Sequence, residues 1–195
     1  MNCFTLGHSN LPWTLFIRLL RLQGVKRVLD VRPNPDEGPS RFHRHHLEWM
    51  LPPSGISYVW LGDDLGGELP DEGLPAPVNL DRRALMHRQP AYIAGWLRLL
   101  QDLRDFPGPT CLLGSTENPL RCHRHWLIGQ DLAALGVEVL HIRGTRKGPP
   151  QVLKVLPPAN PAAIPAARHT HASTPPPETW TDPIRPVSRT PHSGT

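Results

Sequence analysis

The chain has 195 residues, with 21 Lys and Arg against 17 Asp and Glu, and a formal net charge of +4 that permits an anionic ligand or a nucleic acid without requiring one. Its three cysteines are too few for a disulfide framework and have no CxxC zinc spacing. Because no apolar run reaches the roughly 20 residues of a membrane span and no secretory signal is recognisable at the start, we expect a cytoplasmic protein without a membrane partner.

Strands and helices are predicted to alternate along the first 145 residues. The segment that begins at Trp13 repeats its apolar residues with the period of a helix, whereas short apolar runs bounded by Gly or Pro are typical of strands. We expect strands at 3–6, 25–31, 57–61, 110–113 and 137–142, and helices at 13–22, 42–51, 90–103 and 122–136. This order predicts an α/β fold, with an about five-stranded, mostly parallel sheet flanked by helices in a Rossmann-like three-layer arrangement.

The pattern stops after Arg143. Residues 146–195 contain 12 prolines and few large apolar side chains, so they cannot bury enough surface to offset the entropy of ordering. Gln151 to Leu156 is the one apolar stretch of this tail that could dock on the domain. We therefore predict an α/β domain at 1–145 and a Pro-rich, disordered tail at 146–195.

Polar residues gather in the loops that follow four of the predicted strands. These loops contain Gly7-His8-Ser9, Asp30-Val31-Arg32, Gly66-Gly67 and the run from Asn118 to Arg124. Loops after parallel strands emerge at one edge of the sheet, where open α/β folds bind their ligands. The sequence therefore predicts a polar, cation-rich pocket at this edge, with Ser9, Gly66, Gly67 and Asn118 among its ligand-binding residues.

Cys122 has two interpretations. It lies where a helix is predicted to begin, next to Arg121 and Arg124, and both features lower the pKa of a thiol. It would then be a thiolate nucleophile, a redox thiol or a metal ligand. As an alternative, it is a small apolar residue that packs inward, since cysteine is among the most buried residue types.

The other charged candidates also have structural alternatives. His8 is a candidate general base, or a structural histidine that bridges two loops. Asp30 and Arg32 alternate along a strand end and share a face, which suits an internal salt bridge and also a site in which Arg32 binds a substrate anion with Asp30 as base or orienting group; the two interpretations are compatible. His123 and Arg124 are candidates to bind a phosphate or carboxylate at the helix start; as an alternative, they are solvated residues of its first turn or bind carbonyls of the preceding loop.

A cluster of histidines precedes and enters the second predicted helix. His43 and His46 are one turn apart, which suits a metal pair, but no carboxylate or cysteine is obviously placed to complete a site. We interpret the segment as an exposed basic face with Arg41 and Arg44, able to touch nucleic-acid phosphates, and predict no metal site there.

Several runs are shared, in order and spacing, with a known family. They are Thr5-Leu6-Gly7-His8-Ser9, Leu29 to Arg32, Ile56 to Val59, Leu65-Gly66-Gly67 and Asn118 to Arg124. Through these runs, residues 1–143 resemble the domain-of-unknown-function 488 family. The resemblance implies a compact bacterial or archaeal α/β domain without an established reaction. The family pattern usually has a cysteine five residues before the proline of this loop and often an acidic residue three before it; here Gly114 and Thr116 stand there, which weakens any two-thiol mechanism.

These observations leave several functions open, and whether the protein is an enzyme is one of them. The first is the binding of an anionic ligand such as a nucleotide or nucleic-acid fragment, with Arg32 and Arg124 on the anion, His8 as acid or base and Cys122 as nucleophile. The second is thiol, sulfur-transfer or redox activity at Cys122. The third is a non-catalytic nucleic-acid or ligand-binding module, and a weaker fourth is a metal or haem site of Cys122 with His8 or His123.

Overall fold

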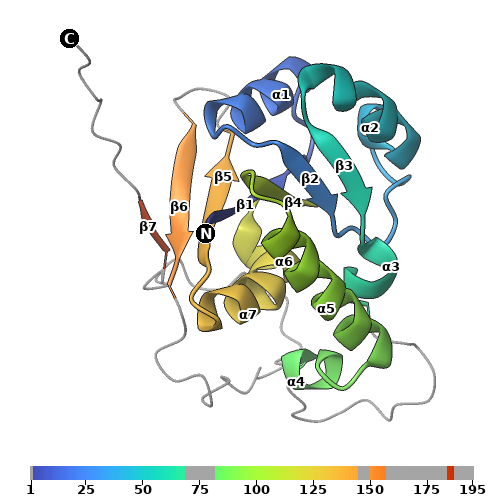
Figure 1. The fold of residues 1–195 in the computed structure, drawn as a ribbon. Coiled ribbons are helices and arrows are strands. Elements are labelled where there is room, and N and C mark those ends of the chain that lie inside the picture. Colours follow the sequence, from blue (N-terminus) through green and yellow to red (C-terminus); the bar gives the residue numbers. More distant parts are fainter. Residues whose placement is uncertain (1, 69–81, 145–149, 157–183, 187–195) are drawn as a thin grey trace, which may run out of the picture.

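The computed structural model describes residues 2–68, 82–144, 150–156 and 184–186, whose strands form one seven-stranded sheet (Figure 1). The parallel strands have the order β3-β2-β4-β1-β5, and β6 and β7 continue the sheet antiparallel beside β5. The strands are β1 (Asn2–Gly7), β2 (Arg27–Asp30), β3 (Ser57–Trp60), β4 (Thr110–Gly114), β5 (Glu138–Arg143), β6 (Gln151–Val155) and β7 (Ile184–Pro186). The five expected strands are thus the parallel ones.

Helices connect the parallel strands, as the alternating pattern predicts. They are α1 (Trp13–Leu22), α2 (Arg44–Met50), α3 (Gly62–Leu65), α4 (Arg82–Met86), α5 (Pro90–Asp105), α6 (His123–Trp126) and α7 (Ile128–Ala134), with 3₁₀ turns at Ser40–Phe42, Pro52–Ser54 and Pro119–Arg121. Within the described ranges, none of these helices has both the length and the apolar content that a bilayer crossing requires. The α/β class with a mostly parallel sheet flanked by helices is confirmed.

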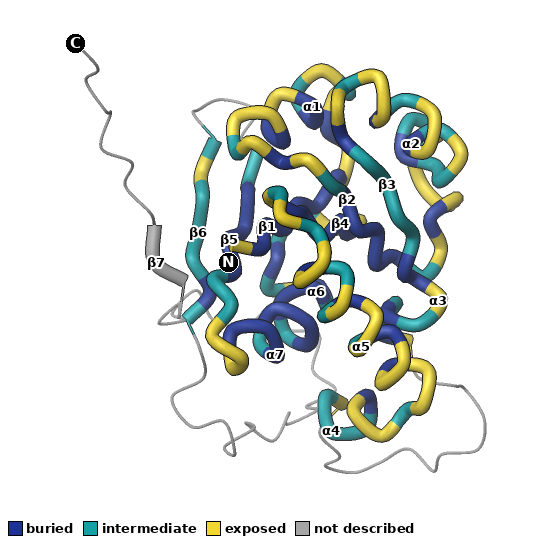
Figure 2. The backbone as a smooth tube through the Cα atoms, viewed as in Figure 1, coloured by how far each residue is buried: buried dark blue, intermediate teal, exposed yellow. Residues whose placement is uncertain are grey.

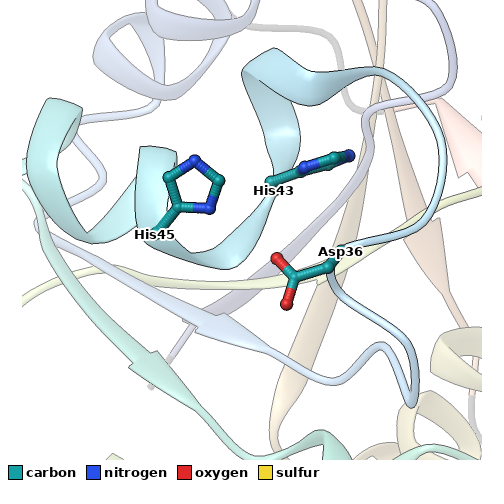
Figure 3. Close-up of side chains that lie close together, drawn as sticks. All are labelled: Asp36, His43 and His45. Carbon is teal, nitrogen blue, oxygen red and sulfur yellow. The ribbon is translucent and has the colours of Figure 1, made fainter.

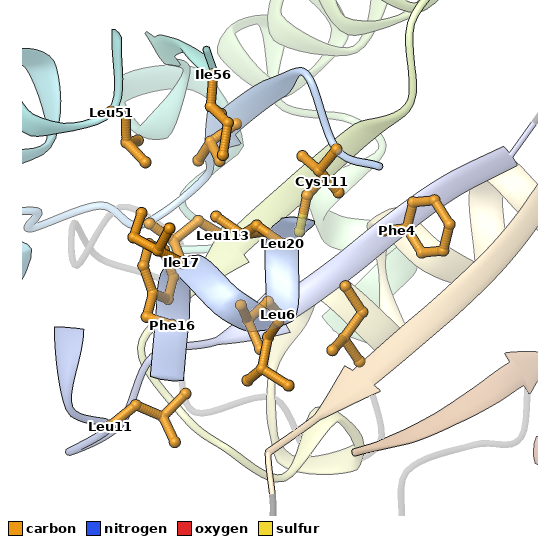
Figure 4. Packing of buried hydrophobic residues seen from close by; sticks show 14 of the residues in the cluster. Phe4, Leu6, Leu11, Phe16, Ile17, Leu20, Leu51, Ile56, Cys111 and Leu113 are labelled. Atoms are coloured by element: carbon orange, nitrogen blue, oxygen red, sulfur yellow. The ribbon is translucent and has the colours of Figure 1, made fainter. Parts of the chain in front are cut away.

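Two hydrophobic clusters lie on opposite faces of the sheet. Successive strand residues point to opposite faces, so Phe4 and Leu6 of β1 join the cluster under α1 and α2, while Cys3 joins the one under α5 and α7. Figure 4 shows the first cluster, in which side chains of α1 such as Phe16 and Leu20 pack on the strands. Figure 2 shows that β1, β4 and β5 in the middle of the sheet are largely buried, whereas α1, α2 and α5 have exposed sides. The molecule therefore has three layers.

Two details differ from the predicted elements. The helix expected over 122–136 is divided into α6 and α7, because Leu127 leaves the helical region with φ −112° and ψ −81°. The apolar stretch from Gln151 extends the sheet as β6, which pairs with β5, so ordered structure continues past residue 145. Most of the predicted disordered tail lies outside the described residues.

The connections that follow the neighbouring strands β1 and β4 cross opposite faces of the sheet. The chain passes from β1 through α1 to β2 on one side, and from β4 through α6 and α7 to β5 on the other. Helices α1 and α7 cover opposite faces, as the two clusters show. In open α/β sheets, the crevice at the carboxyl ends of two such strands is the usual place for a ligand.

Phe16 provides a test of this packing. Its side chain is fully buried, with ring centroids 5.5 Å from Trp13 and 5.1 Å from Phe42. Phe16→Ala should lower the free energy of unfolding by about 3–5 kcal/mol in urea denaturation, because it removes buried contacts and leaves a cavity. Leu97→Ala, at a side chain that is 61% exposed, should change it by about 0.5 kcal/mol or less. Equal losses in the two variants would contradict the assigned core.

Candidate functional site

Strands β1 and β4 end side by side, each at a glycine. Gly7 and Gly114 are paired in register. A β-carbon on Gly7 would lie 1.8 Å from the Thr116 carbonyl oxygen and 2.8 Å from Nη2 of Arg124. A β-carbon on Gly114 would lie 2.9 Å from Nη1 of Arg124 and 3.1 Å from Sγ of Cys122. The two glycines therefore leave the room that a guanidinium and a thiol occupy.

Arg124 is a buried cation with incomplete compensation. Its side chain is 1% exposed, Nε–H donates to Thr5 Oγ1 at 3.3 Å, and Nη2–H donates to the Glu117 carbonyl at 3.0 Å. Nη1 is buried and has no hydrogen-bond partner. Among the ion pairs of the described part of the chain, none includes Arg124. A buried charge in this state has unused capacity to bind an anion.

Cys122 lies beside this cation, immediately before α6. Burial raises the pKa of its thiol, but the hydrogen bond with His123, the charge of Arg124 and the backbone N–H of Arg124 outweigh that effect and lower the pKa to about 6. The thiol is therefore largely ionised at neutral pH, the state in which cysteine is a nucleophile. The residue is 7% exposed, as expected of a cysteine that packs inward, and yet it lies among cations. Its role as a nucleophile, redox thiol or metal ligand stays a prediction.

His123 is oriented by two contacts. Its Nε2–H donates to the Val31 carbonyl at 2.8 Å, which leaves Nδ1 facing Sγ of Cys122 at 3.8 Å. The Nδ1 atom accepts from a neutral thiol or, when protonated, donates to a thiolate. Gly67, at φ +76°, lies against the imidazole ring, where a β-carbon would come within 2.8 Å of it. This glycine therefore supports the ring directly.

The second arginine at this edge, Arg32, is fully used inside the protein. Nε–H and Nη2–H donate to the two carboxylate oxygens of Asp30 at 2.8 and 2.5 Å, and Nη2–H also reaches the Phe42 carbonyl at 2.8 Å. Tyr58 adds a hydrogen bond to Asp30 at 2.7 Å. The internal salt bridge expected from the alternation of Asp30 and Arg32 is present, and both side chains are at most 1% exposed.

His8 completes this second group. Its Nδ1–H donates to the Ser9 carbonyl at 2.9 Å, so Nε2 accepts from Nη1 of Arg32 at 3.0 Å, and the ring stacks on Phe42 at 4.5 Å. Burial, together with the charge of Arg32, lowers the pKa of His8 to about 4. The imidazole is therefore neutral at pH 7, and its lone pair is already engaged. His8 and Arg124 lie at the same edge of the sheet, since the His8 N–H donates to the Gly114 carbonyl.

The remaining predicted ligand-binding residues have local roles in the structure. Ser9 is exposed at φ 38°, and the Asn118 side chain accepts the Leu120 N–H at 3.1 Å to cap the turn before Cys122. Gly66 and Gly67 line a cavity of about 790 Å³. Its charged lining residues are Asp63, Asp64, Glu68 and Arg82, and the lining includes neither Cys122 nor Arg124. The predicted residues therefore share one edge, but this cavity takes in only the two glycines among them.

Sequence reasoning missed a buried polar chain behind Arg124. Thr5 Oγ1 contacts His141 Nδ1 at 2.6 Å, and His141 Nε2 contacts His125 Nδ1 at 2.9 Å. Burial, then the charges of His125 and Arg124, hold the pKa of His141 well below its ordinary value. The available signal was a polar residue inside each of two apolar strands, Thr5 in β1 and His141 in β5.

Metal binding at Cys122 finds little support in the donor set. His123 offers one nitrogen beside Sγ, while both nitrogens of His8 are bonded within the protein. Over the described residues, Cys122 belongs to no group of three metal-ligating side chains. Two donors alone fall short of the three or four that protein zinc sites use.

Residues 13–130 match the family described as "Domain of unknown function DUF488". No curated protein and no solved structure matches the chain. The matched range contains Cys122, His123 and Arg124 together with the Asp30 and Arg32 pair, whereas β1 precedes it. Because the match covers more than half of the 195 residues and contains four of the five runs quoted from the sequence, the chain belongs to the DUF488 family.

Proposed function

We propose that Cys122 acts as a thiolate nucleophile on a substrate whose anionic group is bound by Arg124. The observation that carries this proposal is the buried Nη1 of Arg124, which has no partner in the described residues and adjoins Sγ of Cys122 across Gly114. A buried cation beside an ionised thiol favours a substrate that brings a negative charge next to its electrophilic atom. Phosphate and carboxylate groups, including those of nucleotides, have this chemistry.

The proposed step is a nucleophilic displacement by the Cys122 thiolate at the electrophilic atom of the substrate. The Sγ lone pair forms a bond to the electrophilic atom of the substrate, and the leaving group departs with the electron pair of the bond that breaks. Nδ1 of His123 faces Sγ and passes the proton that the thiol has given up to the leaving group. The Val31 carbonyl holds the other ring nitrogen, so the imidazole is oriented before the substrate arrives.

This proposal assigns Arg32, Asp30 and His8 to the support of the site. The donors of Arg32 are directed at Asp30, Phe42 and His8, so an anion would compete with a buried carboxylate for them. Removing one partner of such a buried pair costs about 3–5 kcal/mol. Arg124 has no such competitor in the described residues, which favours it as the anion-binding cation.

The three cysteines allow a direct test by alkylation. Cys3 and Cys111 are fully buried, and burial raises the pKa of Cys3 to about 12 and that of Cys111 well above its ordinary value. Iodoacetamide at pH 7 should therefore add one carbamidomethyl group, at Cys122, faster than it modifies a free cysteine. The rate should rise with pH through a midpoint at about 6 and level off above about pH 7, because the thiolate is the reactive form. Intact-mass and peptide mass spectrometry measure both quantities.

Cys122→Ser serves as the control and should leave the folded protein unmodified. The thiolate proposal would be refuted by a Cys122 that reacts no faster than free cysteine at pH 7, or whose rate still climbs steeply between pH 7 and 9.

The role of Arg124 is tested with a charged reagent of the same leaving group. The ratio of the iodoacetate rate to the iodoacetamide rate should be higher at Cys122 than for free cysteine, because the iodoacetate carboxylate can contact Nη1 of Arg124. Inorganic phosphate should slow the iodoacetate reaction selectively. Arg124→Gln should abolish the preference and lower the rate at pH 7 by at least about 10-fold, provided that circular dichroism shows a folded variant.

The phosphate measurement needs no substitution, so it stands even where Arg124→Gln fails to fold. A ratio of the two reagents equal to that of free cysteine, with no protection by phosphate, would rule out anion binding at Arg124.

A further inference from the structure

A second cluster of chemically competent side chains lies away from Cys122, at the start of α2. Asp36, in the loop after β2, and His43 and His45 each offer one ligand atom, and these three atoms lie within 4.8 Å of one another. Figure 3 shows the Asp36 carboxylate beside the two imidazole rings. The sequence analysis weighed His43 and His46, found no carboxylate to complete a site and predicted none; the structure instead brings His45 and Asp36 close to His43.

We propose that Asp36, His43 and His45 bind a divalent first-row transition-metal ion such as Zn²⁺. Two imidazole nitrogens and one carboxylate oxygen form a donor set that Zn²⁺ and its neighbours in the series prefer, and that leaves coordination positions for water. Donor atoms of a tetrahedral zinc site lie about 3.4 Å apart, given Zn–N and Zn–O distances of about 2.0–2.1 Å. Asp36 and His45 are exposed, so their side chains are free to make this approach.

Backbone contacts already orient two of the three ligands. The partner of His43 Nε2 is the Gly38 carbonyl at 3.1 Å, which only accepts, so Nε2 carries the proton and Nδ1 keeps a lone pair. Metal-binding histidines usually donate their second N–H in this way. The Arg44 N–H donates to Oδ1 of Asp36 at 2.9 Å, which fixes the carboxylate and leaves Oδ2 available.

The positive charges near the cluster are directed elsewhere. Nε–H of Arg44 donates to Glu48 at 2.8 Å, and its guanidinium stacks over Trp60 at 4.4 Å. Arg41 donates to the Leu11 carbonyl at 2.9 Å and to Asn10 at 2.5 Å. Both guanidinium groups therefore have partners of their own. Among the described residues of this cluster, Asp36 supplies the negative charge that would balance a bound metal ion.

The experiment uses the full chain without a histidine tag, in a Cys122→Ser background that removes the thiol as a competing ligand. After treatment with EDTA and dialysis, isothermal titration with Zn²⁺ should give one equivalent, and elemental analysis should confirm it. Bound Zn²⁺ should raise the unfolding midpoint by about 5 °C, because an ion that binds only the folded state stabilises it.

Asp36→Asn and His45→Gln should each weaken Zn²⁺ binding by at least about 10-fold. Asparagine retains an oxygen for the Arg44 N–H, and both positions are exposed, so the unfolding midpoints without zinc should stay close to that of the parent. His46→Gln is the matched control, because His46 is the other histidine of α2 and packs edge-on against Trp13 at 5.4 Å. It should leave zinc affinity unchanged.

The proposal is overturned if the parent binds less than one equivalent of zinc. It is equally overturned if Asp36→Asn and His45→Gln bind zinc as tightly as the parent, or if His46→Gln weakens binding as much as they do.

Discussion

The Arg124 guanidinium is buried at the carboxyl ends of β1 and β4, in the space that Gly7 and Gly114 leave open. Burying a cation is costly unless groups of opposite charge or strong acceptors surround it. Arg124 obtains a hydroxyl from Thr5 and a carbonyl from Glu117, but no carboxylate in the described chain pairs with it. The ionised thiol of Cys122 is the adjacent negative group. The Arg124 guanidinium and the Cys122 thiolate therefore stabilise each other, and the loss of either charge would disfavour the other.

The two buried arginines at this edge, Arg32 and Arg124, differ in how many of their donors have partners inside the protein. Arg32 is held by a carboxylate, a carbonyl and an imidazole, and its charge adds to the effect of burial, which lowers the pKa of His8 to about 4. This group connects the end of β2 to the Phe42 turn and to the loop after β1, so it stabilises the edge on which the thiol lies. Arg124 has one guanidinium nitrogen without a hydrogen-bond partner among the described residues, which is why the proposed function assigns the substrate anion to it.

Periodicity and turn residues predicted the fold well, because the helices have amphipathic faces and each parallel strand is a short apolar run. The shared edge of His8, Arg32, Cys122 and Arg124 also followed from parallel strand order. The sequence could not show which arginine was already paired, since Asp30 and Arg32 on one face suited both a salt bridge and a substrate site. Nor could it place Asp36 beside His43, because the conformation of an irregular loop joins them.

Glycine at position 114 bears on the kind of thiol chemistry that this chain can perform. A β-carbon there would lie 3.1 Å from Sγ of Cys122, so a cysteine at this position, which the family pattern usually has, would bring a second thiol against the first. The other cysteines, Cys3 and Cys111, are fully buried, and their raised pKa values keep them protonated. With no partner thiol supplied by Gly114, the thiolate is stabilised by Arg124 and His123. That environment suits attack on a substrate better than dithiol–disulfide exchange.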